Sequence, residues 1–172
     1  KRGQLPSRYI LEKNYIIKRL NQGDLVIEIS GGSPTQSTGR ITYINDFMLK
    51  KYDRDIVCTN FCRAITLKSK YSMEYFYYYW NYLYNLDVFF QYENGTTGIK
   101  NLDINAFLDT FTIAKPNQEL ILEFHKFISV LLDNIQFIGS ENDKLEETRD
   151  TLLPKLMSGE IRVPLESEED IS

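Results

Sequence analysis

Residues 121–156 read ILEFHKFISVLLDNIQFIGSENDKLEETRDTLLPKL, and this stretch decides the fold of the last third of the chain. Its apolar residues recur in alternating steps of three and four, and polar residues fill two of the positions. A spacing that averages 3.5 residues keeps one seam of a helix facing a partner helix along its whole length. The seam positions are Ile121, Phe124, Ile128, Leu131, Ile135, Ile138, Asn142, Leu145, Arg149, Leu152 and Leu156.

These heptads predict one helix over residues 117–157, roughly 60 Å long at 1.5 Å per residue. Asn117 suits the N-cap, Pro154 predicts a kink or restart near the far end, and Gly159 predicts the end of the helix. A domain of this size does not need so long a helix for its own core. We therefore expect the helix to measure a distance or to join this chain to another, and Asn142 to fix the register of the pairing.

The region before the helix, residues 1–116, has the mixed pattern of a small α+β domain. Residues 71–92 contain 12 of the 23 Phe, Tyr and Trp residues at helical spacing, which favours core packing over base stacking. Turn residues bound short β-branched runs elsewhere. The sequence predicts a small twisted sheet with strands at 25–29, 41–44, 56–59, 63–67 and 110–114, and helices at 73–90 and 103–108.

Length and composition allow one ordinary domain plus the long helix. No run of 18 apolar residues is present, so we expect no membrane span and a cytoplasmic protein. Cys58 and Cys62 have poor metal spacing and are interpreted as reduced structural thiols. The opening Lys1-Arg2-Gly3-Gln4 indicates a fragment of a longer protein, and residues 164–172 are predicted to be an acidic disordered tail.

Charge is distributed unevenly along the chain. Residues 1–116 hold 15 Lys and Arg against 11 Asp and Glu, a net charge of +4, whereas residues 117–172 hold 5 against 13, a net charge of -8. The N-terminal domain can therefore face a polyanion, and the helix is not expected to do so.

Residues with the spacing of a catalytic or cofactor site are missing from the sequence. The single histidine, His125, lies on the predicted helix beside the seam and is interpreted as a flanking helix residue. No glycine-rich phosphate loop of the GxxxxGK[ST] or GxGxxG type occurs. The carboxylates of residues 141–150 fit a solvated helix face. We therefore expect no enzyme activity, no cofactor and no metal.

Two polar loops that contain glycine, residues 31–40 and 95–101, favour a DNA-binding function. Glycine allows backbone N–H groups to approach a phosphate, hydroxyl groups add donors, and basic residues supply charge. Gln, Asn and Arg side chains carry the paired donors and acceptors that read purine edges. The candidate DNA-binding residues are Ser33, Thr35, Gln36, Arg40, Arg63, Thr96, Thr97, Lys100 and Asn101.

Three stretches resemble the specificity (S) subunit of type I restriction-modification systems. One is GTTGIKNL at residues 95–102, followed by a short helix and a strand. The second is RDTLLPKLMSGEI at residues 149–161, which is similar to the end of the spacer helix in that family. Gly23-Asp24-Leu25, ahead of a strand and a polar loop, is the third.

This resemblance implies a target recognition domain over residues 1–116 and a spacer helix over residues 117–163. Subunits of this family have two such domains joined by two antiparallel helices, and each domain reads one half of a split double-stranded DNA target. They are non-catalytic and recruit methyltransferase (M) and restriction (R) subunits. We expect the M subunit to contact residues 152–159, in particular Leu153, Lys155 and Met157.

A chain with one spacer helix lacks the second helix of the family pattern. We therefore expect an antiparallel, two-fold homodimer, in which Arg149 needs an acidic partner. Two alternatives stay open: a recognition domain of a related bipartite restriction enzyme, and a coiled-coil scaffold with a globular head and no DNA role.

Overall fold

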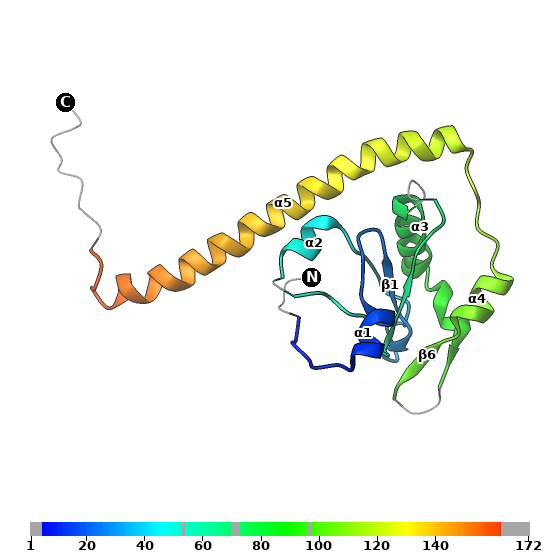
Figure 1. Ribbon diagram of the computed structural model, residues 1–172, viewed down its shortest axis with the longest axis horizontal. Coiled ribbons are helices and arrows are strands. Elements are labelled where there is room, and N and C mark those ends of the chain that lie inside the picture. Colours follow the sequence, from blue (N-terminus) through cyan, green and yellow to red (C-terminus); the bar gives the residue numbers. More distant parts are fainter. Residues whose placement is uncertain (1–4, 53, 70–72, 96–97, 163–172) are drawn as a thin grey trace. The chain divides into compact units, whose positions relative to one another are not determined.

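The computed structural model describes residues 5–52, 54–69, 73–95 and 98–162 and confirms the α+β class (Figure 1). No helix of these residues is long and apolar enough to cross a membrane. The elements in chain order are α1 (Glu12–Lys18), β1 (Leu25–Glu28), β2 (Ser30–Gly31), β3 (Ile41–Tyr43), α2 (Asp46–Lys50), β4 (Cys62–Ile65), α3 (Met73–Asn85), the 3-10 helix η2 (Val88–Tyr92), β5 (Glu93–Asn94), β6 (Lys100–Leu102), α4 (Ile104–Thr110) and α5 (Gln118–Met157).

The strands form two small antiparallel sheets instead of the single sheet that the sequence predicts. Strand β1 lies in the centre of the first sheet, between β3 and β4, with Val26 opposite Thr42 and Ala64. The second sheet has the order β2-β6-β5. Because only Ile29 separates β1 from β2, the chain passes directly from the first sheet into the second.

The main core lies on the face of the first sheet to which Leu25 and Ile27 contribute. Helix α3 packs there (Figure 1), and the indole of Trp80 stacks on the Phe89 ring with 4.5 Å between ring centroids. Phe107 of α4 contacts both rings at 5.1 Å. The aromatic run is thus used mainly for core packing, as its helical spacing predicts.

A second, smaller core lies on the opposite face of the same sheet, where Val26 points. Leu20, Ile44, Ile56 and Cys58 form it. Helix α2, which the sequence analysis did not identify, borders this cluster and is capped by the Asn45 side chain, which accepts a hydrogen bond from the backbone N–H of Met48 at 2.9 Å. Helix α1 was also not identified, because its first residues carry no side-chain cap and it buries no residue.

Three of the predicted elements are wrong in type or length. Residues 56–59 form no strand, because Val57 makes only an isolated bridge with Arg19 while its neighbours fill the second core. Residues 111–114 are irregular, since α4 continues to Thr110. The aromatic helix ends at Asn85 and not at residue 90, because Asp87 takes a left-handed conformation with φ of 58° and a 3-10 turn follows.

The long helix is confirmed at both ends. Asn117 accepts a hydrogen bond from the backbone N–H of Leu120 at 2.8 Å, and Gly159, with φ of +76°, follows the last turn. Of the kink or restart predicted at Pro154, the restart is wrong, because α5 continues to Met157 with Pro154 inside it. The chain divides into two compact units between Val130 and Leu131, so the first turns of α5 belong to the first unit.

We expect Trp80→Phe to lower the free energy of unfolding by about 2–4 kcal/mol, measured by chemical denaturation. The substitution leaves a cavity beside Phe89 and removes the donor that bonds the buried carbonyl of Gly39 at 2.6 Å. Tyr82→Phe is the matched control on the exposed side of α3 and should change stability by less than about 0.5 kcal/mol. Equal effects of the two variants would contradict this assignment of the core.

Candidate nucleic-acid interface

The two polar loops, residues 31–40 and 95–101, are joined by the second sheet. Ser30 of β2 lies opposite Asn101 of β6, and Gly31 lies opposite Lys100. On its other edge β6 pairs with β5, where Asn94 lies opposite Asn101. The loops are therefore fixed next to each other by backbone hydrogen bonds, and their described candidate residues share one part of the first unit.

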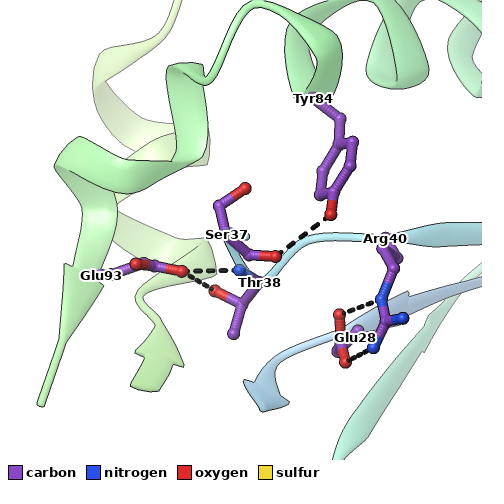
Figure 2. Close-up of polar contacts among 6 residues, drawn as sticks. All are labelled: Glu28, Ser37, Thr38, Arg40, Tyr84 and Glu93. Atoms are coloured by element: carbon purple, nitrogen blue, oxygen red, sulfur yellow. Dashed lines mark hydrogen bonds and ion pairs between the residues drawn. The ribbon is translucent and has the colours of Figure 1, made fainter. Parts of the chain in front are cut away.

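Glu93 connects the loops through its side chain. One carboxylate oxygen, Oε1, accepts hydrogen bonds from the backbone N–H and the hydroxyl of Thr38 at 2.6 and 2.8 Å (Figure 2). The other, Oε2, pairs with the ammonium group of Lys100 at 2.8 Å. Burial alone would raise the pKa of Glu93, but the hydrogen bonds from Lys100 and Thr38 and the charge of Lys100 outweigh it, so the pKa lies below its usual range.

The base of the first loop is also held by helix α3. The Trp80 indole N–H donates to the carbonyl of Gly39, and the Tyr84 hydroxyl donates to the carbonyl of Ser37 at 3.2 Å (Figure 2). Gly39 has φ of +102°, and a Cβ there would lie 3.0 Å from the Phe89 ring, so a larger residue is strained at this position. Residues 37–39 are consequently buried.

The tip of the same loop is exposed and compact. Ser33 and Gln36 exchange two backbone hydrogen bonds, at 2.8 and 3.3 Å, which close a tight turn. The Thr35 and Gln36 side chains are exposed on this turn, and the hydroxyl groups of Ser33 and Thr35 lie 3.4 Å apart. A rigid base therefore presents a short row of hydroxyl and amide groups to solvent.

Two predicted basic contacts are already paired within the chain. The Arg40 guanidinium binds both carboxylate oxygens of Glu28, with Nε–Oε2 at 2.8 Å and Nη2–Oε1 at 2.5 Å (Figure 2), and this hydrogen bonding raises the pKa of Arg40. Lys100 is matched by Glu93 and lies 4.5 Å from the centroid of the Phe90 ring. Arg40 keeps three of its five N–H donors for a ligand, but its charge is compensated.

Arg63 and Asn101 are exposed, whereas Arg40 and Lys100 are half-buried. Within the described residues, Arg63 donates to a neutral partner, the amide oxygen of Asn105, at 3.0 Å. Asn105 belongs to α4, which follows β6 after one residue, so Arg63 lies beside the second sheet although it belongs to the first. Thr96 and Thr97 lie outside the described residues.

Sequence reasoning did not identify Glu93 as the residue that connects the loops, nor Asn105 as the partner of Arg63. An acid beside an Asn-Gly turn is typical of a solvent-exposed loop, and no local pattern distinguishes a buried one. Only the pairing of β5 with β6 brings Glu93 opposite Leu102 and within reach of Lys100.

The seam of α5 is used in two ways. At its start Ile121 is buried, and the Phe124 ring meets the Tyr75 and Tyr78 rings edge-on at 6.3 and 6.2 Å. His125, beside the seam, is half-buried, with Nδ1 3.0 Å from a carboxylate oxygen of the buried Glu74 on α3. The later apolar seam residues are exposed within this chain, namely Leu131, Ile135, Ile138, Leu145, Leu152 and Leu156.

The structure also describes the other residues of the helix for which the sequence predicts a contact with another chain. Arg149 pairs with acidic residues of its own helix, Asp150 at 2.7 Å and Glu146 at 3.6 Å. Asn142 is exposed. Of the predicted M-subunit contacts, Leu153 and Met157 are exposed and Lys155 lies 3.8 Å from the carboxylate of Glu160.

Within the described residues no three His, Cys, Asp or Glu side chains are grouped so that they could hold a metal ion. Cys58 and Cys62 are both free thiols. Burial raises the pKa of the Cys58 thiol, which favours its neutral, unreactive form.

Comparison with known proteins gives one informative similarity. The type I restriction enzyme HindI specificity subunit of Haemophilus influenzae is 35% identical to this chain over 68 residues, which are 40% of this chain and 15% of that subunit. No protein-family model and no solved structure matches the chain. The similarity connects part of this chain with part of a type I specificity subunit, independently of the geometry above.

We predict that acidification weakens the link between the loops. Because the pKa of Glu93 is lower in the folded protein than its ordinary value of 4.5, its ionised form stabilises the fold above that value, and this contribution is lost as the pH falls through the lowered pKa. Glu93→Gln should lower the free energy of unfolding by about 2 kcal/mol at pH 7 and by less near pH 3.

Denaturant unfolding of the variant and the wild type between pH 3 and 7 measures this difference. Glu12→Gln, an exposed carboxylate on α1, is the control and should follow the wild-type curve. A constant difference between Glu93→Gln and the wild type across this range would contradict the assigned role.

Proposed function

We propose that the chain is a DNA-recognition unit of a type I restriction-modification specificity subunit. In this proposal the first unit, Lys1–Val130, reads one half of a bipartite double-stranded target, and the helix beyond it provides spacing and assembly. The observation that carries the proposal is the joining of the two polar loops by β2, β6 and Glu93. The partial similarity to the HindI specificity subunit supports the choice of system.

The geometry favours reading by amide and hydroxyl groups over attraction by net charge. Gln36 and Asn101 are exposed amides that can pair with a base edge, most simply the N6 and N7 of adenine. Arg63, whose described partner is a neutral amide, supplies charge for the DNA, and the three remaining donors of Arg40 are held in position by Glu28. A protein discriminates between bases through a few hydrogen-bonding groups held in a fixed orientation.

The exposed seam of α5 supports a role in assembly. A row of exposed apolar side chains at heptad spacing is stabilised when a second helix covers it. We propose an antiparallel pair with a second copy of the chain, and contact of the last turn, through Leu153, Lys155 and Met157, with an M subunit that in turn associates with R. No catalytic step is assigned to this chain.

A scaffold without DNA contact is the alternative from another class. The pairing of Arg40 with Glu28 and of Lys100 with Glu93 favours it, because two of the basic side chains expected at DNA serve the fold. The two functions differ in their dependence on Gln36 and Asn101, which have no structural task in a scaffold.

Genome-wide mapping of adenine methylation tests the proposal. The chain is expressed with its neighbouring methyltransferase gene in a host without adenine methylation, and we expect one new split motif. Gln36→Ala and Asn101→Ala should each relax the motif at one position, since a lost bidentate base contact costs about 1–3 kcal/mol of discrimination. Asn85→Ala, an exposed amide at the end of α3, is the matched control and should leave the motif intact.

Methylation at an unchanged motif in both loop variants would reject these residues as readers. Soluble, co-purifying proteins that give no methylation would reject DNA recognition and favour the scaffold.

The helix pairing predicts a dimer in sedimentation equilibrium at micromolar concentration, with twice the chain mass of 20.2 kDa. Ile138→Asp places a charge in the seam and should give a monomer, because burying an unpaired carboxylate is costly. Ser140→Asp adds the same charge about 200° further around the helix and should preserve the dimer. A monomeric wild type would contradict the pairing.

A further inference from the structure

A cleft of about 590 Å³ lies outside the two loops, and the proposed function assigns it no role. The cleft is lined by the N-terminal segment, α1, and Leu49, Tyr52, Arg54, Asp55 and Val57, on the side of the second core. Its size falls within the range of small-molecule sites. The lining residues from Arg8 to Gln22 precede β1 in the chain, whereas the first loop follows β1.

Three arginines, Arg8, Arg19 and Arg54, line this cleft. Among its described lining residues the one carboxylate is Asp55, which accepts the Tyr15 hydroxyl and pairs with Arg19 at 3.2 Å. Within the part of the chain that the structure describes, the other two guanidinium groups pair with no carboxylate. The described lining residues therefore contain three arginines and one carboxylate.

The two remaining guanidinium groups converge on one residue. Nη1 of Arg8 donates to the carbonyl of Ser7 at 3.2 Å, and Nη1 of Arg54 donates to the Ser7 hydroxyl at 3.4 Å. Both of these acceptors are neutral, so most of the donors and both charges stay available. Gathering like charges is unfavourable unless an anion compensates them.

We propose that this cleft binds phosphate groups, with Arg8 and Arg54 as the binding residues. The planar, forked guanidinium matches phosphate oxygens in pairs, which a lysine does not. Tyr15 and Tyr52 add aromatic rings and hydroxyl groups to the wall. The phosphate comes either from the DNA backbone or from a free phosphate ester, and both present the same oxygens.

The position of the cleft favours the DNA backbone, and this part of the proposal rests on the proposed function. In the chain, strand β1, four residues or about 13 Å long, lies between the cleft residues Leu20, Asn21 and Gln22 and the first loop. One strand of B-DNA carries a phosphate every 3.4 Å along the helix axis. A duplex bound at the loops therefore presents about four phosphates per strand over a length equal to that of β1.

The test uses the full chain, three probes and four proteins. The probes are inorganic phosphate, AMP and a 20-base-pair duplex of arbitrary sequence. The proteins are the wild type, the double variant Arg8→Gln/Arg54→Gln, Asp55→Asn and the control Lys13→Gln. Lys13 is an exposed base of α1 that does not line the cleft. Unfolding curves establish that each variant folds.

We expect the double variant to bind all three probes at least tenfold more weakly. Its slope of log K against log salt for the duplex should fall by about 2, because two phosphate contacts are lost. Asp55→Asn, which releases Arg19, should bind phosphate about threefold more tightly. Lys13→Gln should bind phosphate and AMP as the wild type does.

The outcomes separate the two sources and the two proposals. Loss of AMP binding with an unchanged duplex slope identifies a free phosphate ester as the ligand, whereas a smaller duplex slope identifies the DNA backbone. If the wild type binds no duplex, the proposed function fails while the phosphate and AMP measurements still decide the cleft. Unaltered binding in the double variant, or an equal loss in Lys13→Gln, overturns the phosphate site.

Discussion

The candidate surface depends on the hydrogen bonds and the ion pair of the buried Glu93 carboxylate. It holds Thr38 from one loop and Lys100 from the other, and both loops are otherwise short of apolar side chains that could fix them by packing. Trp80 completes the anchor by bonding the Gly39 carbonyl from within the core. Backbone that is polar and rich in glycine loses much entropy on ordering, so it needs such specific hydrogen bonds. The result is a rigid base beneath an exposed tip, which is the arrangement that a recognition site needs.

Charge has a different role here from the one that composition indicates. A net charge of +4 for residues 1–116 favours a polyanion, yet Arg40 and Lys100 are matched by carboxylates that lie beside them. Among the described arginines, Arg63 near the second sheet and Arg8 and Arg54 of the cleft donate to neutral partners. Attraction to DNA would then come from a few separated guanidinium groups, while the loops supply orientation and discrimination.

The long helix also has two roles along its length. Its first turns belong to the globular unit, where Ile121 is buried, Phe124 meets two tyrosine rings and His125 approaches Glu74. Beyond Val130 the apolar seam is exposed within the chain. The same heptad pattern thus first secures the helix to its own domain and then offers a surface for another helix, because the apolar spacing is identical in both contexts.

The sequence by itself determined the long helix, both of its ends, the α+β class, the cap at Asn117 and the aromatic core helix, because these depend on spacing and on local hydrogen bonds. Tertiary structure alone decided that the loops are neighbours, that Glu93 is buried between them, and that Arg40 and Lys100 are paired. It also removed the strand predicted at 56–59, where Ile56 and Cys58 fill the second core, and the strand predicted at 110–114, where α4 continues to Thr110. Residues distant in the chain come together only through sheet pairing, and no local pattern carries that information.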